Sequence, residues 1–132
     1  MGAMNARRIL GPAACAAALL SIATPAHADR TYRVDMTATA KLKGTDLVVQ
    51  LTGSPVGTCK GTARLQGDGA TFRARCRDGR ISVRIRFAGR DQSRGSWRFT
   101  SGTGRFRGAW ASGRYTGNLS QLRFRLTGRA RF

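Results

Sequence analysis

Apolar and polar residues alternate with a period of two along most of the chain. The pattern is clearest from residue 59 to residue 87, CKGTARLQGDGATFRARCRDGRISVRIRF, where one set of alternate positions is apolar and the other is rich in arginine. This alternation is typical of strands that are buried on one face. It recurs on both sides of that stretch, and helical spacing of apolar residues is never satisfied after residue 28. The sequence therefore predicts an all-β domain.

A strong two-residue hairpin signal lies within this stretch at Asp78-Gly79. A turn there places Cys76 opposite Ile81, and every further pair on that face is apolar. On the other face it places Arg73 opposite Arg84. We expect the apolar face to point inward and the arginine face to point toward solvent.

The turn before this hairpin determines how two cysteines are placed. A turn at Gly67-Asp68 puts Cys59 directly opposite Cys76, at a cross-strand separation that a disulfide can span. Closing a loop of this size contributes about 3 kcal/mol by the loop-entropy estimate. A metal site or a catalytic thiol is disfavoured, because no companion ligand accompanies the cysteines. The sequence predicts a Cys59–Cys76 disulfide.

The alternation continues toward both ends of the chain. A turn at Lys43-Gly44 places Leu47 opposite Ala40. After the polar connection Ala88–Ser96, which is the longest expected, the apolar face restarts. A turn within residues 101–104 would then bring each tryptophan opposite a glycine, which leaves room for the indole ring. A second turn at Ser112-Gly113 would place Trp110 opposite Tyr115.

Eight strands, each paired with its neighbour in sequence, have two ways to bury one apolar face. They can close into an up-and-down barrel or fold over as a β-sandwich. We favour the eight-stranded barrel, because closure removes both exposed edges. A barrel of this size either fills with side chains or keeps one small cavity, and the mixture of large aromatic residues with alanine and glycine leaves both open. The arginine-rich outer face excludes a membrane-spanning barrel.

The N-terminal segment has the features of a signal peptide. Arg7 and Arg8 are followed by an apolar core, Ile9–Ile22, and by the cleavage-site sequence Ala26–Ala28. We expect cleavage after residue 28, a single mature domain over residues 29–132, and a secreted or periplasmic location.

Charge is strongly one-sided in this chain. It carries 24 lysines and arginines against 6 aspartates, with no glutamate, and its net charge is +18, or +16 once Arg7 and Arg8 are removed. A biased genome explains a preference for arginine over lysine but does not explain the missing glutamate. A field of this sign attracts polyanions.

The segment Ser101–Gly117, SGTGRFRGAWASGRYTG, resembles the G-T-G-x-F-x-x-A-x-G signature of the dirigent and allene oxide cyclase barrels, which recurs in small secreted bacterial proteins. The matching residues are Gly102, Thr103, Gly104, Phe106 and Ala109. The usual run of small residues is interrupted by Trp110-Ala111. The resemblance covers about a sixth of the mature chain. It implies an eight-stranded barrel and transfers no catalytic residue.

The mature sequence offers little equipment for catalysis. It has neither glutamate nor histidine, because the only histidine of the full chain, His27, leaves with the signal peptide. The usual general base, the usual zinc ligand and most carboxylate pairs are therefore missing. We expect no catalytic residue, no metal site, no cofactor and a non-enzymatic protein.

The first binding hypothesis is that the outer arginine face holds anionic envelope or extracellular polymers, such as acidic glycans, lipopolysaccharide or an anionic membrane surface. Guanidinium groups suit phosphate, sulfate and carboxylate. Specific recognition of nucleic acid is not expected, because the aromatic residues share the apolar face and offer no outward stacking platform. The anion-binding candidates are Arg73, Arg75, Arg77, Arg84, Arg86, Arg123 and Arg125.

The alternative hypothesis is a carrier that holds a small apolar ligand inside the barrel. Its candidate lining residues are Trp97, Phe99, Trp110, Tyr115 and Phe124. A third possibility is a protein-binding or inhibitor module that uses the loops Ser54–Thr58 and Ala88–Ser96. The sequence leaves the oligomeric state open.

Overall fold

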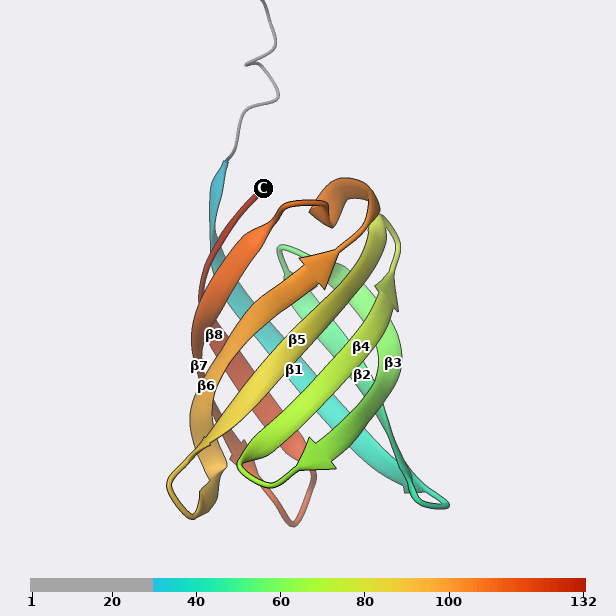
Figure 1. Ribbon diagram of the computed structural model, residues 1–132, viewed down its shortest axis with the longest axis vertical. Helices are drawn as coiled ribbons and strands as arrows, with labels where there is room; N and C mark the ends of the chain where they lie inside the picture. The colour runs from blue at the N-terminus through green and yellow to red at the C-terminus, as the bar shows by residue number, and fades with distance from the viewer. Residues whose placement is uncertain (1–29) are drawn as a thin grey trace, which may run out of the picture.

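The computed structural model describes residues 30–132, which form one closed antiparallel barrel of eight strands (Figure 1). Each strand pairs with its neighbour in sequence, and the first also pairs with the last. The predicted fold class is confirmed, as a barrel and not as a sandwich. The strands are β1 Thr31–Lys43, β2 Asp46–Ser54, β3 Gly57–Gln66, β4 Gly69–Cys76, β5 Gly79–Ala88, β6 Asp91–Gly102, β7 Trp110–Asn118 and β8 Arg123–Arg131, with one short 3-10 helix, η2 Gly104–Phe106.

The predicted signal peptide, residues 1–28, lies outside the described residues. Within the described part of the chain, no helix is long and apolar enough to cross a membrane.

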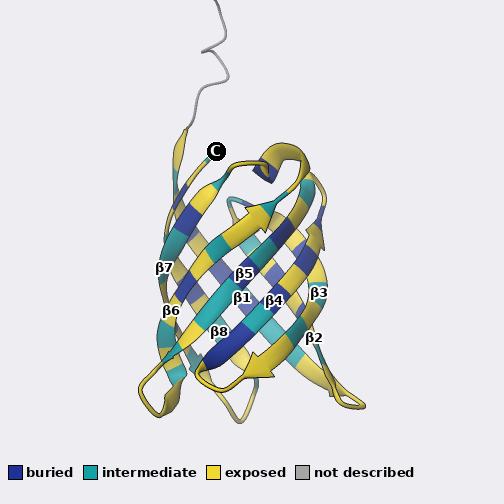
Figure 2. Cartoon of the chain, in the orientation of Figure 1, coloured by how far each residue is buried: buried dark blue, intermediate teal, exposed yellow. Residues whose placement is uncertain are grey.

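The inner and outer faces follow the predicted alternation. Along the strands, inner positions that are buried or half-buried alternate with outer positions that are mostly exposed (Figure 2). All residues that are buried among 30–132 are apolar or glycine, and no polar or charged residue of this range is buried. The apolar phase of the sequence therefore builds the core.

The predicted pairing of β3 with β4 is confirmed. Cys59 lies opposite Cys76 and the two form a disulfide, with their Cα atoms 4.1 Å apart. Gly61 lies opposite Ala74, as the Gly67-Asp68 turn requires. The cysteines thus identified the register of this hairpin correctly.

Two other hairpins keep the predicted faces but turn one residue away from the predicted position. Ala40 lies opposite Val49 rather than Leu47, since the β1–β2 turn uses residues 44–45. Cys76 lies opposite Gly79 rather than Ile81. Gly79 is needed for packing instead of for the turn, because a Cβ there would stand 2.1 Å from the carbonyl oxygen of Thr103. A shift of one turn position changes the partner by two residues, so each side chain stays on its face.

The region after β5 departs most from the prediction. The expected long connection, Ala88–Ser96, is mostly strand, since β6 begins at Asp91. The strand that turns at residues 101–104 and at Ser112-Gly113 would enclose is replaced by η2 and a short loop, and Ser112-Gly113 lies inside β7 instead of forming a turn. Trp97 consequently lies opposite Gly113. Trp110 falls on the outer phase and is 56% exposed.

The two ends of the barrel differ. Residues 30 and 132, the first and last that the structure describes, lie with the helix η2 at one end of the barrel, which we call the closed end (Figure 1). The turns β1–β2, β3–β4, β5–β6 and β7–β8 lie at the opposite end, which we call the open end.

Candidate ligand cavity and charged outer face

The barrel contains a cavity of about 710 Å³ that extends to the open end. Its wall comes mainly from aliphatic residues of the inner phase, among them Ala38, Val49, Ala70 and Ile85. The wall also includes residues of the turns and strand ends at the open end, such as Thr45 and Leu119. The cavity is therefore an apolar chamber within the barrel, with its mouth among the turns of the open end.

Side-chain size explains why one half of the barrel holds a cavity. Four alanines, at 38, 40, 63 and 70, line this half. In the other half the inner positions carry Met36, Ile81, Trp97 and Phe106, each at most 2% exposed. We call these the open half and the filled half.

Trp97 is held firmly in the filled half. Its indole N–H donates to the carbonyl oxygens of Arg114, at 3.2 Å, and Thr127, at 3.1 Å. The ring lies opposite Gly113, which pairs in turn with Gly128. Phe99 packs beside it, with ring centroids 5.9 Å apart. These glycines give the indole space to lie against the barrel wall.

The predicted lining residues are divided by the structure. Tyr115 and Phe124 line the cavity, whereas Trp97 and Phe99 are not among its lining residues. The predicted inward placement of Trp110 is wrong. In β7 the buried inner position is Ala111, so Trp110 beside it points outward. The prediction missed the aliphatic majority of the wall. The cluster of alanines on the inner phase of β1, β3 and β4 was the available signal.

Polar groups are concentrated at the mouth. The Tyr115 hydroxyl donates to the carbonyl oxygen of Gln92 at 3.1 Å. Burial, with a smaller contribution from the charge of Asp91, raises the pKa of Tyr115 to about 12, so the phenol stays neutral at physiological pH. Arg64 and Asp46 are the charged residues of the wall. The chamber is thus apolar inside, and the few polar groups of its wall lie near the entrance.

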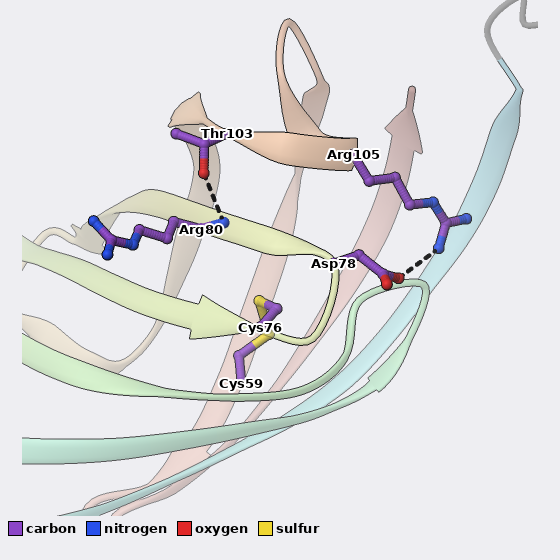
Figure 3. Close-up of a disulfide and its surroundings, with 6 residues drawn as sticks. All are labelled: Cys59, Cys76, Asp78, Arg80, Thr103 and Arg105. Atoms are coloured by element: carbon purple, nitrogen blue, oxygen red, sulfur yellow. Dashed lines mark hydrogen bonds and ion pairs between the residues drawn. A yellow bond between two sulfur atoms is a disulfide. The ribbon is translucent and has the colours of Figure 1, made fainter.

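The closed end is covered by η2 and the residues around it. Phe106 is fully buried there, and its ring meets that of Phe132 edge-on, with centroids 5.2 Å apart. Arg105 covers Phe132, with its guanidinium carbon 5.1 Å from the ring centroid, and forms an ion pair with Asp78 at 3.2 Å. Figure 3 shows this ion pair beside the disulfide, on the side of the barrel where Thr103 accepts a hydrogen bond from the backbone N–H of Arg80. These contacts close the barrel at the end opposite the mouth.

The seven candidate anion-binding arginines all point outward, and they fall into two groups. Arg84 and Arg86 pair with Asp68, at 2.9 and 3.8 Å, and Arg125 pairs with Asp35 at 3.0 Å. Within residues 30–132, the remaining four form no ion pair. These four are Arg73, Arg75, Arg77 and Arg123.

The expected opposition of Arg73 and Arg84 is wrong, since Arg73 faces Ser82 in the observed register. A different row of cations replaces it. Arg75 lies between Lys60 on β3 and Arg80 on β5, and all three side chains are exposed. Like charges opposite one another are destabilising, and a bound anion would relieve the repulsion.

The loops suggested for protein binding are smaller than expected. Val56, in the β2–β3 turn, is buried in the core, and only Gly89 and Arg90 separate β5 from β6. A protein-binding role stays a prediction. Across residues 30–132, no three His, Cys, Asp or Glu side chains gather as a possible metal site.

Comparison of the chain with family models, curated proteins and solved structures gave no match. The resemblance of Ser101–Gly117 to the dirigent and allene oxide cyclase signature stays a prediction. In the structure this segment spans the end of β6, the helix η2 and most of β7.

Proposed function

We propose that this protein binds an amphiphile with a single apolar tail, holding the tail inside the barrel. The observation that carries the proposal is the cavity of about 710 Å³ with an aliphatic wall and a mouth at one end. Sites for small molecules typically measure 300–1,000 Å³ and combine apolar walls with a few polar groups. A tail in this chamber would bury apolar surface that water otherwise covers.

The polar head of the ligand would remain at the mouth. Arg64 is the only cation of the cavity wall, and Thr45 and Gln92 supply neutral polar groups nearby. Asp46, the carboxylate of the wall, lies opposite Lys43 in the β1–β2 pairing, so a second cation stands beside it. A guanidinium group forms paired hydrogen bonds with carboxylate or phosphate. The best match is therefore an anionic head on an apolar tail, as in a fatty acid. The role we propose is binding without catalysis.

A neutral fluorescent probe tests the proposal, because it has no attraction to the arginines of the outer face. We expect N-phenyl-1-naphthylamine to gain fluorescence on binding and a saturated fatty acid to displace it. Ala63→Phe places a ring in the cavity wall and should weaken probe binding at least tenfold. Thr62→Phe adds the same ring on the outer face and should leave binding unchanged. The proposal fails if the wild type does not bind the probe, or if the two variants behave alike.

A second function is favoured by the cation row Lys60–Arg75–Arg80, which we infer to bind anionic polymers such as acidic glycans. No carboxylate forms an ion pair with these three residues within the described range. Replacing all three by glutamine should lower the salt concentration that elutes the protein from a heparin column. The matched control, Arg84, Arg94 and Arg125 to glutamine, removes the same charge from cations that are already paired. Equal losses in the two triple variants would reduce the effect to net charge and contradict a site at this row.

A further inference from the structure

Three leucines at the mouth are both exposed and part of the cavity wall. Leu42 is 70% exposed, Leu65 is 64% exposed and Leu119 is 45% exposed. All three line the cavity. We call them the leucine rim. They come from the end of β1, the end of β3 and the β7–β8 turn, so they surround the mouth from different sides.

The leucine rim is unusual on this surface. Among the described residues only two other large apolar side chains are exposed, Val48 and Trp110. Trp110 begins β7, at the other end of the barrel. Exposed apolar groups that gather in one place and are flanked by polar residues mark surfaces that bind a partner or a membrane.

Four cations flank the rim, and we call them the basic collar. Lys43 is the last residue of β1, and Lys41 lies two positions before it. Arg90 lies in the β5–β6 turn, and Arg123 begins β8. All four are exposed, and none forms an ion pair within residues 30–132.

The carboxylates at this end do not cancel the collar. Asp68 is shared by Arg84 and Arg86. Asp91 pairs with Arg94 at 3.1 Å, and the Ser93 side chain and backbone N–H also hydrogen-bond to it and lower its pKa. Asp46, the remaining carboxylate of the open end, lies opposite Lys43 in the β1–β2 pairing and can offset only one of the four cations. The mouth is therefore apolar at its edge and positive around it.

We propose that the open end docks on an anionic lipid bilayer. The leucine rim would enter the boundary between headgroups and acyl chains, while the basic collar contacts anionic headgroups. Apolar insertion combined with attraction to anionic lipid is how interfacial proteins bind membranes. The mouth then faces the bilayer, so an acyl tail can enter the cavity without crossing water. This last step rests on the proposed ligand, whereas docking rests on the rim and the collar alone.

Charge favours a bilayer over a second copy of this chain. Two open ends brought face to face would oppose two basic collars, and like charges at that distance repel. An anionic surface supplies the opposite sign. Self-association and binding to a neutral surface are therefore outcomes that contradict the proposal.

The test is sedimentation with vesicles of phosphatidylcholine containing 30% phosphatidylglycerol, compared with vesicles of phosphatidylcholine alone. We expect the wild type to bind the anionic vesicles and to be released as salt rises. Replacing Leu42 and Leu119 by serine should weaken binding about tenfold or more. Trp110→Ser removes an exposed apolar side chain from the closed end and should have no effect.

Charge variants distinguish the basic collar from the other cations of the outer face. Replacing Lys43, Arg90 and Arg123 by glutamine should weaken vesicle binding about a hundredfold. Replacing Lys60, Arg75 and Arg80 by glutamine removes the same charge away from the mouth and should weaken it far less. Equal losses in the two triple variants, a loss with Trp110→Ser, no binding by the wild type, or equal binding to neutral vesicles would each overturn the proposal.

The neutral probe keeps this proposal separate from the ligand proposal. The collar variant Lys43, Arg90 and Arg123 to glutamine changes no residue of the cavity wall and should still bind the probe in solution. A wild type that docks through its mouth but binds no probe would remove the ligand and leave the docking surface. A wild type that binds the probe but no vesicle would exclude the docking surface and leave the ligand proposal standing.

Discussion

A matched pair of alanines on β4 tests whether the open half of the barrel has room that the filled half lacks. Ala70 and Ala74 both point inward and are 7% and 6% exposed, so exposure does not distinguish them. Ala70 lines the cavity. Ala74 belongs to the core cluster and lies between Gly61 and Ile81, next to the disulfide pair along the strands. Replacing each by leucine adds the same three carbon atoms at two different sites.

The expected effects have opposite signs. Burying three further carbons in the cavity contributes at most about 2 kcal/mol, at about 0.8 kcal/mol each. Ordering the leucine side chain removes roughly 0.5–1 kcal/mol of that gain. Ala70→Leu should therefore raise the free energy of unfolding by about 1 kcal/mol. Ala74→Leu overfills a packed core and should lower it by about 1–3 kcal/mol.

Urea unfolding with the disulfide intact measures this difference. For a domain of this size, a gap of about 3 kcal/mol separates the two midpoints by about 1–2 M urea, provided that the slopes agree. Equal destabilisation of both variants would refute the account of an open half and a filled half. A greater loss in Ala70→Leu than in Ala74→Leu would refute it more strongly.

Three further predictions concern the contacts that hold the barrel together. Replacing Cys59 and Cys76 by serine should cost about 3 kcal/mol of stability, from the entropy of the loop of 17 residues, measured by urea unfolding against the oxidised wild type. Trp97→Phe leaves two carbonyl oxygens without the indole N–H that both accept, and should cost about 1–3 kcal/mol; an unchanged midpoint would contradict that bonding. The hydrogen bond from Arg125 lowers the pKa of Asp35 below its usual 3.8, so the stability that this carboxylate contributes is present above that pH and is lost as the pH falls through the lower folded-state value. The stability difference between wild type and Asp35→Asn should therefore shrink on acidification from pH 5 to pH 2, and a constant difference would exclude the carboxylate as its cause.

The faces of the strands followed from sequence because a period of two is a local property. Each strand carries its own alternation, and a turn that moves by one residue preserves it, as the hairpins at residues 44–45 and 77–78 show. Cross-strand partners depend on which residues form the turn. The disulfide supplied that information for β3 and β4, and nothing equivalent existed elsewhere in the chain.

The prediction for the region from Gly102 to Ala111 was wrong for a different reason. Its glycines and serines permit several tight turns, and the sequence does not reveal which apolar residue will cover the end of the barrel. Burial of Phe106 selects the 3-10 helix η2. β7 then starts later than expected, and Trp110 changes face as a result. A long-range packing requirement therefore prevailed over local turn preference.

The cavity itself was foreseeable only as one of two possibilities. The inner phase contains both large aromatic residues and alanines, and their order along the chain does not show at which height each lies in the barrel. Closure with the observed register groups the alanines of β1, β3 and β4 at one end. The same grouping leaves the leucine rim without a partner in the fold.

The most direct test of the central claim is methyl NMR of alanine-labelled protein titrated with a saturated fatty acid. Ala38, Ala63 and Ala70 line the cavity, whereas Ala74 and Ala130 belong to the packed core. We predict large shifts and contacts to the acyl chain for the cavity alanines, with the packed alanines little changed. Fatty acid contacts confined to the outer arginines, with all inner alanine methyls unmoved, would contradict a ligand inside the barrel.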